Sequence, residues 1–196
     1  MAGVKKYDRT ELLDRAMDLF HRRSYNATST ADLVDELGVN RKSMYAEFGS
    51  KQELFEAALD HYDTTSLTAV LAAVESGEAG LDAIRSTFAG FASASEDWAQ
   101  GRGCLLSNTA FERSVLDPAV GEYVERYFRR LTHAFRGALE NARRNGELDV
   151  DRDLDDLAAY LAMALVGIAT LAKGRADPEL IHAATRAAMS VLDAAD

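Results

Sequence analysis

Two short helix signals separated by a single glycine constrain the fold more than any other feature. Ser29, followed three residues later by the acid Asp32, has the pattern of a capping box and predicts a helix start. Gly38 ends that helix, and Asn40 is a strong N-cap for a second one. A turn of about three residues between two short helices is the spacing of a helix-turn-helix. The segment therefore predicts this motif.

One helix is predicted before this pair and another after it. Over residues 10–23 the apolar residues recur on one broad helical stripe, with Thr10 as the predicted N-cap. The stripe consists of Leu12, Leu13, Ala16, Met17, Leu19 and Phe20. Ser50 and Glu53 repeat the capping pattern ahead of a helix that we expect to run unbroken over residues 51–73.

The charge of the chain restricts where nucleic acid can bind. With 22 Lys and Arg against 32 Asp and Glu, the formal net charge is −10, which argues against non-specific coating of nucleic acid or of an anionic membrane. Over residues 38–51 the local charge is positive, because this segment contains three basic residues and one acidic residue. These are Arg41, Lys42, Lys51 and Glu47. Any DNA contact is therefore expected to be local to this segment.

The second short helix has distinct inward and outward faces. At about 100° per residue, Met44 and Phe48 share the inward face. Lys42, Ser43 and Ala46 then point outward. The first turn of such a helix carries the donors and the positive dipole end that phosphates and guanine edges require. We therefore expect this helix to contact DNA.

These residues resemble the TetR family of bacterial transcriptional regulators from Thr10 to Phe55. Three runs carry the resemblance: Tyr25, Ala27, Thr28 and Ser29; Gly38 to Phe48, which reads GVNRKSMYAEF; and Gly49 to Phe55, which reads GSKQELF. The resemblance implies an N-terminal DNA-binding domain of three helices. It also implies a palindromic double-stranded operator, and repression relieved by a small-molecule effector. The thiol of Cys104 adds a thiol-reactive compound as a second candidate effector.

The resemblance implies roles for individual residues. It assigns DNA phosphates to four side chains: Thr28, Ser29, Tyr45 and Lys51. It places Arg41, Lys42 and Ser43 nearest the bases, and Asn40 completes the expected set of DNA contacts. The chain departs from the family pattern at two positions. Members often carry glycine where Lys42 stands, and histidine or another phosphate partner where Glu47 stands.

The remainder of the chain predicts more helices and no sheet. Apolar residues beyond residue 80 keep helical spacing, and only 2 prolines are present. We predict an all-α fold, with a helix-turn-helix DNA-binding domain over residues 1–50 joined to a larger helical domain over residues 51–196. The run Arg102–Thr109, which reads RGCLLSNT, resembles a segment of many TetR members and implies a ligand-sensing domain.

The last two predicted helices favour a homodimer. Leu157 to Ala172 carries no charge over sixteen residues, short of the roughly 18 to 20 that a membrane span needs. The helix is apolar on nearly all sides. One face can therefore pack on the core of its own subunit, while the other face, together with a last helix over Pro178 to Leu192, packs on a partner subunit. The alternative is a monomer in which the first of these helices is wholly internal.

Cys104 has two interpretations. Next to a glycine and Arg102, its thiol is a candidate sensor of oxidants or electrophiles; as a buried cysteine it is an inert apolar residue. A ligand site between helices is typically apolar with a few polar groups. The candidate ligand-binding residues are Phe88, Phe91, Trp98, Cys104, Asn108, Thr109, Phe111, Arg113 and Tyr127. We expect the aromatic members of this set to belong to the core as well.

The sequence gives no support for catalysis. No Gly-x-Ser-x-Gly motif occurs, and none of the 4 histidines pairs with another at metal-ligand spacing. We expect no enzyme activity, no cofactor, no metal and no membrane partner. The first twenty residues lack an apolar signal core, which favours a cytoplasmic protein. The alternatives left open are a ligand-binding or redox-sensing protein whose helix-turn-helix contacts a protein, and a cysteine-dependent enzyme.

Overall fold

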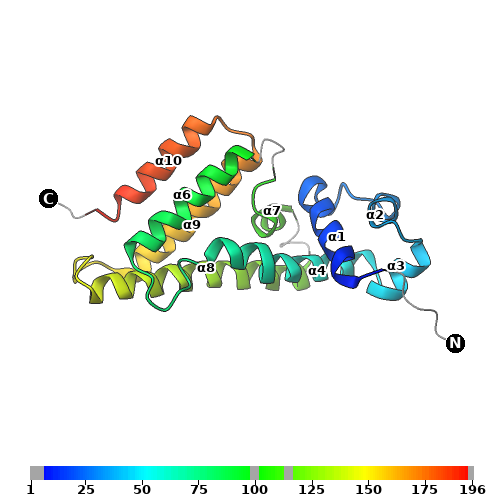
Figure 1. Cartoon of the computed structure of the whole chain (residues 1–196), viewed down its shortest axis with the longest axis horizontal. Coiled ribbons are helices and arrows are strands. Elements are labelled where there is room, and N and C mark those ends of the chain that lie inside the picture. Colours follow the sequence, from blue (N-terminus) through cyan, green and yellow to red (C-terminus); the bar gives the residue numbers. More distant parts are fainter. Residues whose placement is uncertain (1–6, 98–101, 113–116, 194–196) are drawn as a thin grey trace. The chain divides into compact units, whose positions relative to one another are not determined.

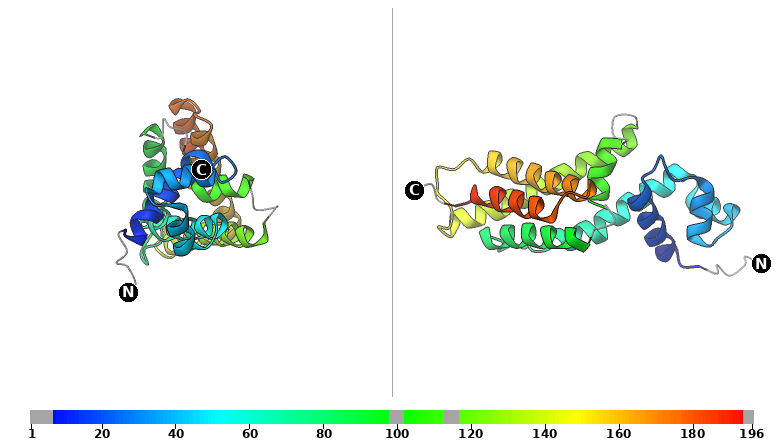
Figure 2. Two further views of the ribbon diagram at one scale, coloured as in Figure 1. Left: turned by 90° about the vertical axis from the view of Figure 1, so that its right-hand side faces the viewer. Right: turned by 90° about the horizontal axis from the view of Figure 1, so that it is seen from above.

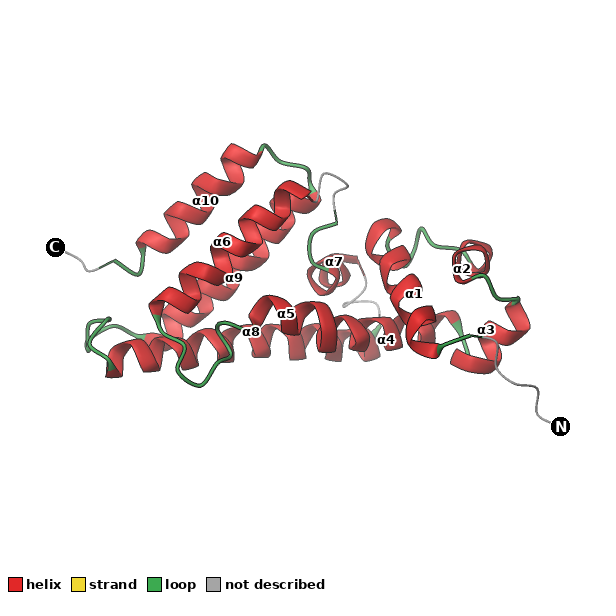
Figure 3. Ribbon diagram, viewed as in Figure 1, coloured by secondary structure: helices red, strands yellow, loops and turns green. Residues whose placement is uncertain are grey.

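The computed structural model describes residues 7–97, 102–112 and 117–193 (Figure 1). Over these residues the regular structure is entirely helical, as predicted (Figure 3). The chain divides into two compact units between Ser66 and Leu67.

The first unit holds the predicted helix-turn-helix. Its helices are α1 (Arg9–Arg23), α2 (Thr30–Leu37), α3 (Arg41–Phe48) and α4 (Lys51–Tyr62). α4 packs on α1, so this compact unit extends past residue 50. Phe20 of α1 and Phe55 of α4 meet edge to face, with ring centroids 4.9 Å apart, and Tyr25 lies 4.8 Å from Phe55. Phe20 and Phe55 belong to the buried core of the unit, and the half-buried Tyr25 lies at its edge.

Side-chain caps set the helix starts in this unit. The capping box on α2 is confirmed, since Ser29 Oγ accepts from the Asp32 amide and the Asp32 carboxylate accepts from the Ser29 amide. Asn40 and Ser50 also cap their helices as predicted. The cap predicted for α1 was wrong, because Asp8 accepts from the Thr10 amide at 2.6 Å and the helix begins at Arg9.

The long helix predicted over residues 51–73 is interrupted. A π-helical turn (η1, Asp63–Leu67) and α5 (Thr68–Leu71) follow α4. The Thr65 hydroxyl donates to the His61 carbonyl at 2.6 Å within this stretch. Side chains that bond to a preceding carbonyl compete with the regular hydrogen bonds of a helix and often bend it.

The second unit is a bundle of long helices. They are α6 (Leu81–Asp97), α7 (Leu105–Glu112), α8 (Pro118–Arg144), α9 (Leu154–Lys173) and α10 (Pro178–Ser190). α8 packs on α6, α7 and α9, while α10 packs on α6 and α9 (Figure 2). Phe88 of α6 and Phe135 of α8 are fully buried, with centroids 5.7 Å apart. The apolar periodicity read from the sequence therefore marks the core of this bundle.

Candidate nucleic-acid interface

α3 has the two faces that its sequence predicts. Met44 and Phe48 are buried, with 1% and 6% of their surface exposed. Lys42 and Ala46 are exposed, and Ser43 is half-buried. The outward face therefore presents one cation, one hydroxyl and one methyl group. These are groups that can approach a phosphate, a base edge and a thymine methyl in a DNA groove.

The N-terminal end of α3 is tied to its own first turn and to α2. Asn40 Oδ1 accepts from the Ser43 amide at 2.9 Å, so its carbonyl oxygen is engaged as a cap. The Arg41 guanidinium lies 5.4 Å from the centre of the Tyr45 ring. The Tyr45 hydroxyl lies 3.2 Å from Thr30 Oγ1. This hydrogen bond, together with the cations Arg41 and Lys51, lowers the pKa of Tyr45.

Two of the expected phosphate contacts are hydroxyls with partners inside the protein. Thr28 is 1% exposed, and its hydroxyl donates to the Ser24 carbonyl at 2.6 Å. Ser29 is exposed, and its hydroxyl donates to the Asp32 carboxylate at 2.6 Å. Phosphate binding by Thr28 requires its side chain to leave Ser24. Phosphate binding by Ser29 requires only a rotation of its hydroxyl.

Lys51 stands at the start of α4 against the loop that precedes α2. Its Nζ donates to the Tyr25 carbonyl at 2.7 Å and lies 4.0 Å from the centre of the Tyr25 ring. An ammonium has three donors, so Lys51 can hold this loop and donate to an anion at the same time. Tyr25 in turn packs on Phe55, which connects the cation to the core of the unit.

The structure also reveals partners that the sequence did not suggest. Glu47, the one acid over residues 38–51, is paired with Arg9, whose Nε lies 3.5 Å from Glu47 Oε1. The Tyr7 hydroxyl donates to Glu47 Oε2 at 3.4 Å. Tyr7 and Arg9 lie about forty positions before Glu47 in the chain, and no local pattern predicts pairs at that separation.

Most of the described ligand candidates lie inside the second unit. Phe88, Phe91, Cys104, Thr109 and Tyr127 are buried. Asn108 is half-buried, and its amide donates to the Arg102 carbonyl at 2.8 Å. Trp98 and Arg113 lie outside the described residues.

The expectation that Phe111 belongs to the core was wrong. Its side chain is 75% exposed. It follows the buried Thr109 by two positions, which places it about 200° around α7, away from the side that packs on α8 and α9.

A small polar group sits in the core of the second unit. The Tyr127 hydroxyl lies 3.0 Å from Ser107 Oγ and accepts from the Cys104 thiol at 3.6 Å. Burial raises the pKa of Tyr127 well above its ordinary value, and the neighbouring Cys104 raises it further. The fold thus brings together Cys104 and Tyr127, two predicted ligand residues, and adds Ser107, which was not among the candidate ligand-binding residues.

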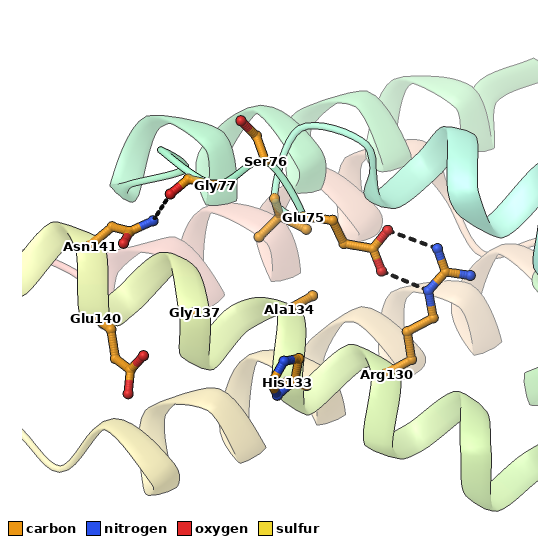
Figure 4. A pocket seen from close by; sticks show the side chains of 10 residues that line it. Glu75, Ser76, Gly77, Arg130, His133, Ala134, Gly137, Glu140 and Asn141 are labelled. Carbon is orange, nitrogen blue, oxygen red and sulfur yellow. Dashed lines mark hydrogen bonds and ion pairs between the residues drawn. The ribbon is translucent and has the colours of Figure 1, made fainter.

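Open hollows lie on the described surface of this unit. One, of about 400 Å³, lies between residues 74–77 and α8 (Figure 4). Along its wall Arg130 holds Glu75 through two hydrogen bonds of 2.6 and 2.7 Å, and Asn141 donates to the Gly77 carbonyl. Another, of about 470 Å³, lies between α5 and α6 and is lined mainly by small residues together with Phe91.

Two large apolar side chains are exposed on α9 and α10. Met163 of α9 is 62% exposed and Leu180 of α10 is 52% exposed. By length and composition alone α9 is able to cross a membrane, because it has 20 residues and extends beyond the sixteen uncharged ones. Of its most apolar stretch of 18 residues, 39% is buried inside the protein. The last two helices of the second unit therefore each expose a large apolar side chain.

Comparisons with known proteins agree with this geometry. Residues 12–58 match the family "Bacterial regulatory proteins, tetR family", and residues 80–188 match "Tetracyclin repressor-like, C-terminal domain". The uncharacterized HTH-type transcriptional regulator YezE of Bacillus subtilis (strain 168) is 33% identical, over 98% of this chain and 100% of that protein. The HTH-type transcriptional repressor ComR of Escherichia coli (strain K12) is 30% identical, over 89% of this chain and 84% of that protein.

Solved structures with the same fold include one with DNA. A cysteine mutant of the TetR family transcriptional regulator CifR, complexed with 26bp double-strand operator DNA, superposes with a TM-score of 0.85 at 27% identity, covering 95% of this chain and 98% of that one. The reduced form of E. coli NemR shares the fold, with a TM-score of 0.75 at 22% identity, covering 93% and 95% of the two chains.

Proposed function

The chain belongs to the TetR family of DNA-binding transcriptional regulators, and we propose that it acts as a homodimeric repressor of a palindromic operator. Members of this family regulate transcription and are not enzymes. Each subunit places α3 in the major groove of one half-site. The site of action is the cytoplasm, and binding of an effector in the second unit releases the DNA.

The outward face of α3 is the observation that carries the proposal. Lys42 and Ala46 are exposed beside Ser43, while Met44 and Phe48 anchor the opposite face. The side chains of Lys42 and Arg41 can donate hydrogen bonds to the O6 and N7 atoms of guanine. The first turn of α3 adds the partial positive charge of a helix N-terminus. A chain with a net charge of −10 needs such a local basic surface to approach DNA.

The exposed apolar side chains of α9 and α10 support the homodimer. These are Met163 and Leu180, and a second copy of the chain buries both. A twofold dimer presents two copies of α3 and so reads a palindrome, with half-sites about one helical turn, or a multiple of it, apart.

The buried Cys104, Ser107 and Tyr127 group supports an effector site in the second unit. The polar atoms of this group lie within an apolar core. A few polar groups among apolar side chains is the composition expected of a ligand-binding site. The dimer is expected to adopt two conformations that differ in the distance between its two α3 helices, and only one of them fits the operator. A small molecule or a thiol-reactive compound releases DNA only if it binds the other conformation more tightly.

Selection of binding sites from a random duplex library tests the proposed function. The purified protein is incubated with the library at physiological salt, and the retained pool is sequenced. We expect a palindrome to be enriched, with a half-site spacing that gives the distance between the α3 helices. Retention of DNA without an enriched sequence, in the presence and absence of candidate effectors, contradicts the proposal and favours a helix-turn-helix that contacts a protein.

Two lysines provide a matched comparison on the selected operator. Lys51→Ala is expected to weaken all duplexes alike by about fivefold at physiological salt, and to reduce the slope of log affinity against log salt by about one, because it removes one phosphate contact. Lys42→Ala is expected to change base preference at a few positions of each half-site instead. Fluorescence anisotropy on the operator and on a scrambled duplex over a salt series measures both effects. Equal losses on every sequence for both variants contradict the assigned roles.

A further inference from the structure

We infer that Glu47 is a positioning residue that fixes the rotation of α3 about its own axis, through Arg9 and Tyr7. It thereby sets the base preference of the outward face without touching DNA. The inference rests on the proposed DNA-binding function of α3, and it concerns an acid that stands on the helix expected to approach phosphates.

The two buried anchors of α3 leave its rotation loosely defined. Each residue of a helix advances by about 100°, so Met44 and Phe48 lie about 40° apart and form a single line of contact. α3 has only eight residues, and other residues must resist rolling about that line. Contacts on both sides of the line are needed for a defined orientation.

Tyr45 and Glu47 supply those contacts. On the same wheel they lie about 80° to either side of the line between the anchors. On one side Tyr45 is hydrogen-bonded to Thr30 of α2, at 3.2 Å. On the other side Glu47 binds Arg9, at the start of α1, and Tyr7, which precedes it, at 3.5 and 3.4 Å. The helix is therefore held from both flanks by two different elements.

The environment of Glu47 fits a positioning role and not a surface charge. Its side chain is 7% exposed, whereas that of Arg9 is 55% exposed. A carboxylate this far removed from water is costly unless cations and donors compensate it, and Arg9 and Tyr7 provide both. The Arg9 guanidinium also lies 5.2 Å from the centre of the Phe48 ring, next to the buried anchor.

A small rotation of α3 has a large effect on base recognition. A side-chain tip about 5–6 Å from the helix axis moves by about 2 Å when the helix turns by about 20°. Hydrogen bonds to base edges tolerate a displacement of only about a few tenths of an ångström between donor and acceptor. Phosphate contacts through the flexible lysine ammonium are less demanding. Loss of the Glu47 contacts is therefore expected to lower affinity for the operator more than affinity for an unrelated DNA sequence.

Glu47→Gln tests the inference, because it keeps the size of the side chain and removes its charge. We expect affinity for the selected operator to fall about tenfold, since misaligned base contacts lose part of their discrimination. Affinity for a scrambled duplex is expected to stay within about twofold, with an unchanged salt slope. If Glu47→Gln instead tightens binding to both duplexes alike, or leaves their ratio unchanged, Glu47 acts as a surface charge and the inference is wrong.

Asp35→Asn provides the matched control. Asp35 is an exposed acid on α2, so this variant removes the same charge from the same motif without disturbing Glu47. We expect it to leave the ratio of operator to scrambled affinity unchanged. A ratio that falls as far as in Glu47→Gln would assign the effect to net charge and overturn the inference.

Tyr7→Phe provides a second variant that leaves every charge in place. It is expected to lower the affinity ratio in the same direction as Glu47→Gln but by less, and the double variant is expected to lose no more than Glu47→Gln alone. If Glu47→Gln fails to fold, as judged by circular dichroism, Tyr7→Phe carries the test. An unchanged ratio in a folded Tyr7→Phe protein would then overturn the inference.

Amide hydrogen exchange in the free protein separates this inference from the proposed function. The α3 amides are expected to exchange faster in Glu47→Gln and Tyr7→Phe than in the unchanged protein or in Asp35→Asn. If the unchanged protein selects no DNA sequence, the proposed function fails, but exchange still decides whether Glu47 positions α3. Identical α3 exchange in all four proteins would overturn the positioning role.

Discussion

Met163→Glu is expected to dissociate the homodimer and to lower operator affinity by about a hundredfold or more. Met163 is 62% exposed on α9, on the face that we propose to be covered by a second copy of the chain. Twofold symmetry places the two new carboxylates in one interface, where burial of each unpaired charge is strongly unfavourable. A monomer engages one half-site and loses the gain in affinity from binding both at once.

Sedimentation velocity and anisotropy on the selected operator measure the two effects of Met163→Glu together. Val150→Glu is the matched control, because Val150 is also an exposed apolar residue, at 71%, but lies in the loop between α8 and α9. We expect Val150→Glu to remain dimeric and to bind the operator like the unchanged protein. A Met163→Glu protein that stays dimeric with full operator affinity would place the interface elsewhere.

Phe55→Ala is expected to lower the free energy of unfolding of the first unit by about 3–5 kcal/mol. Phe55 is 1% exposed, and its ring contacts those of Phe20 and Tyr25. The variant removes the centre of this cluster and leaves a cavity between α1 and α4. Because Tyr25 also holds Lys51, we expect weaker DNA binding even where the variant remains folded.

Urea denaturation followed by circular dichroism measures this loss. Phe111→Ala is the control, since Phe111 is 75% exposed and its replacement is expected to change stability by no more than about 0.5 kcal/mol. A loss below about 1 kcal/mol for Phe55→Ala would mean that the aromatic cluster does not hold the first unit together.

Local chemistry explains why the helix-turn-helix was predictable from the sequence. The caps at Ser29, Asn40 and Ser50 each involve residues three positions apart, and the structure forms all of them. Helical spacing likewise predicted that Phe88, Phe91 and Tyr127 belong to the core, and all three are buried. Both signals arise within one or two turns of helix, so a single sequence contains them.

Features that depend on distant residues were not predictable. The contacts of Glu47 with Tyr7 and Arg9, and the hydrogen bond between Ser107 and Tyr127, join segments that only the tertiary fold brings together. The exposure of Phe111 depends on which side of α7 packs against its neighbours. At the start of α1 the cap is Asp8, two residues before the predicted Thr10.

Directed cleavage of DNA from α3 tests the central claim most directly. Ala46 is exposed on the outward face, and the one natural cysteine, Cys104, is buried, so Ala46→Cys accepts an iron chelate selectively in a Cys104→Ser background. On the selected operator we expect cleavage at two symmetric positions, one in the major groove of each half-site. Cleavage scattered along the duplex, or none while the labelled protein remains bound, would contradict the claim that α3 reads the operator.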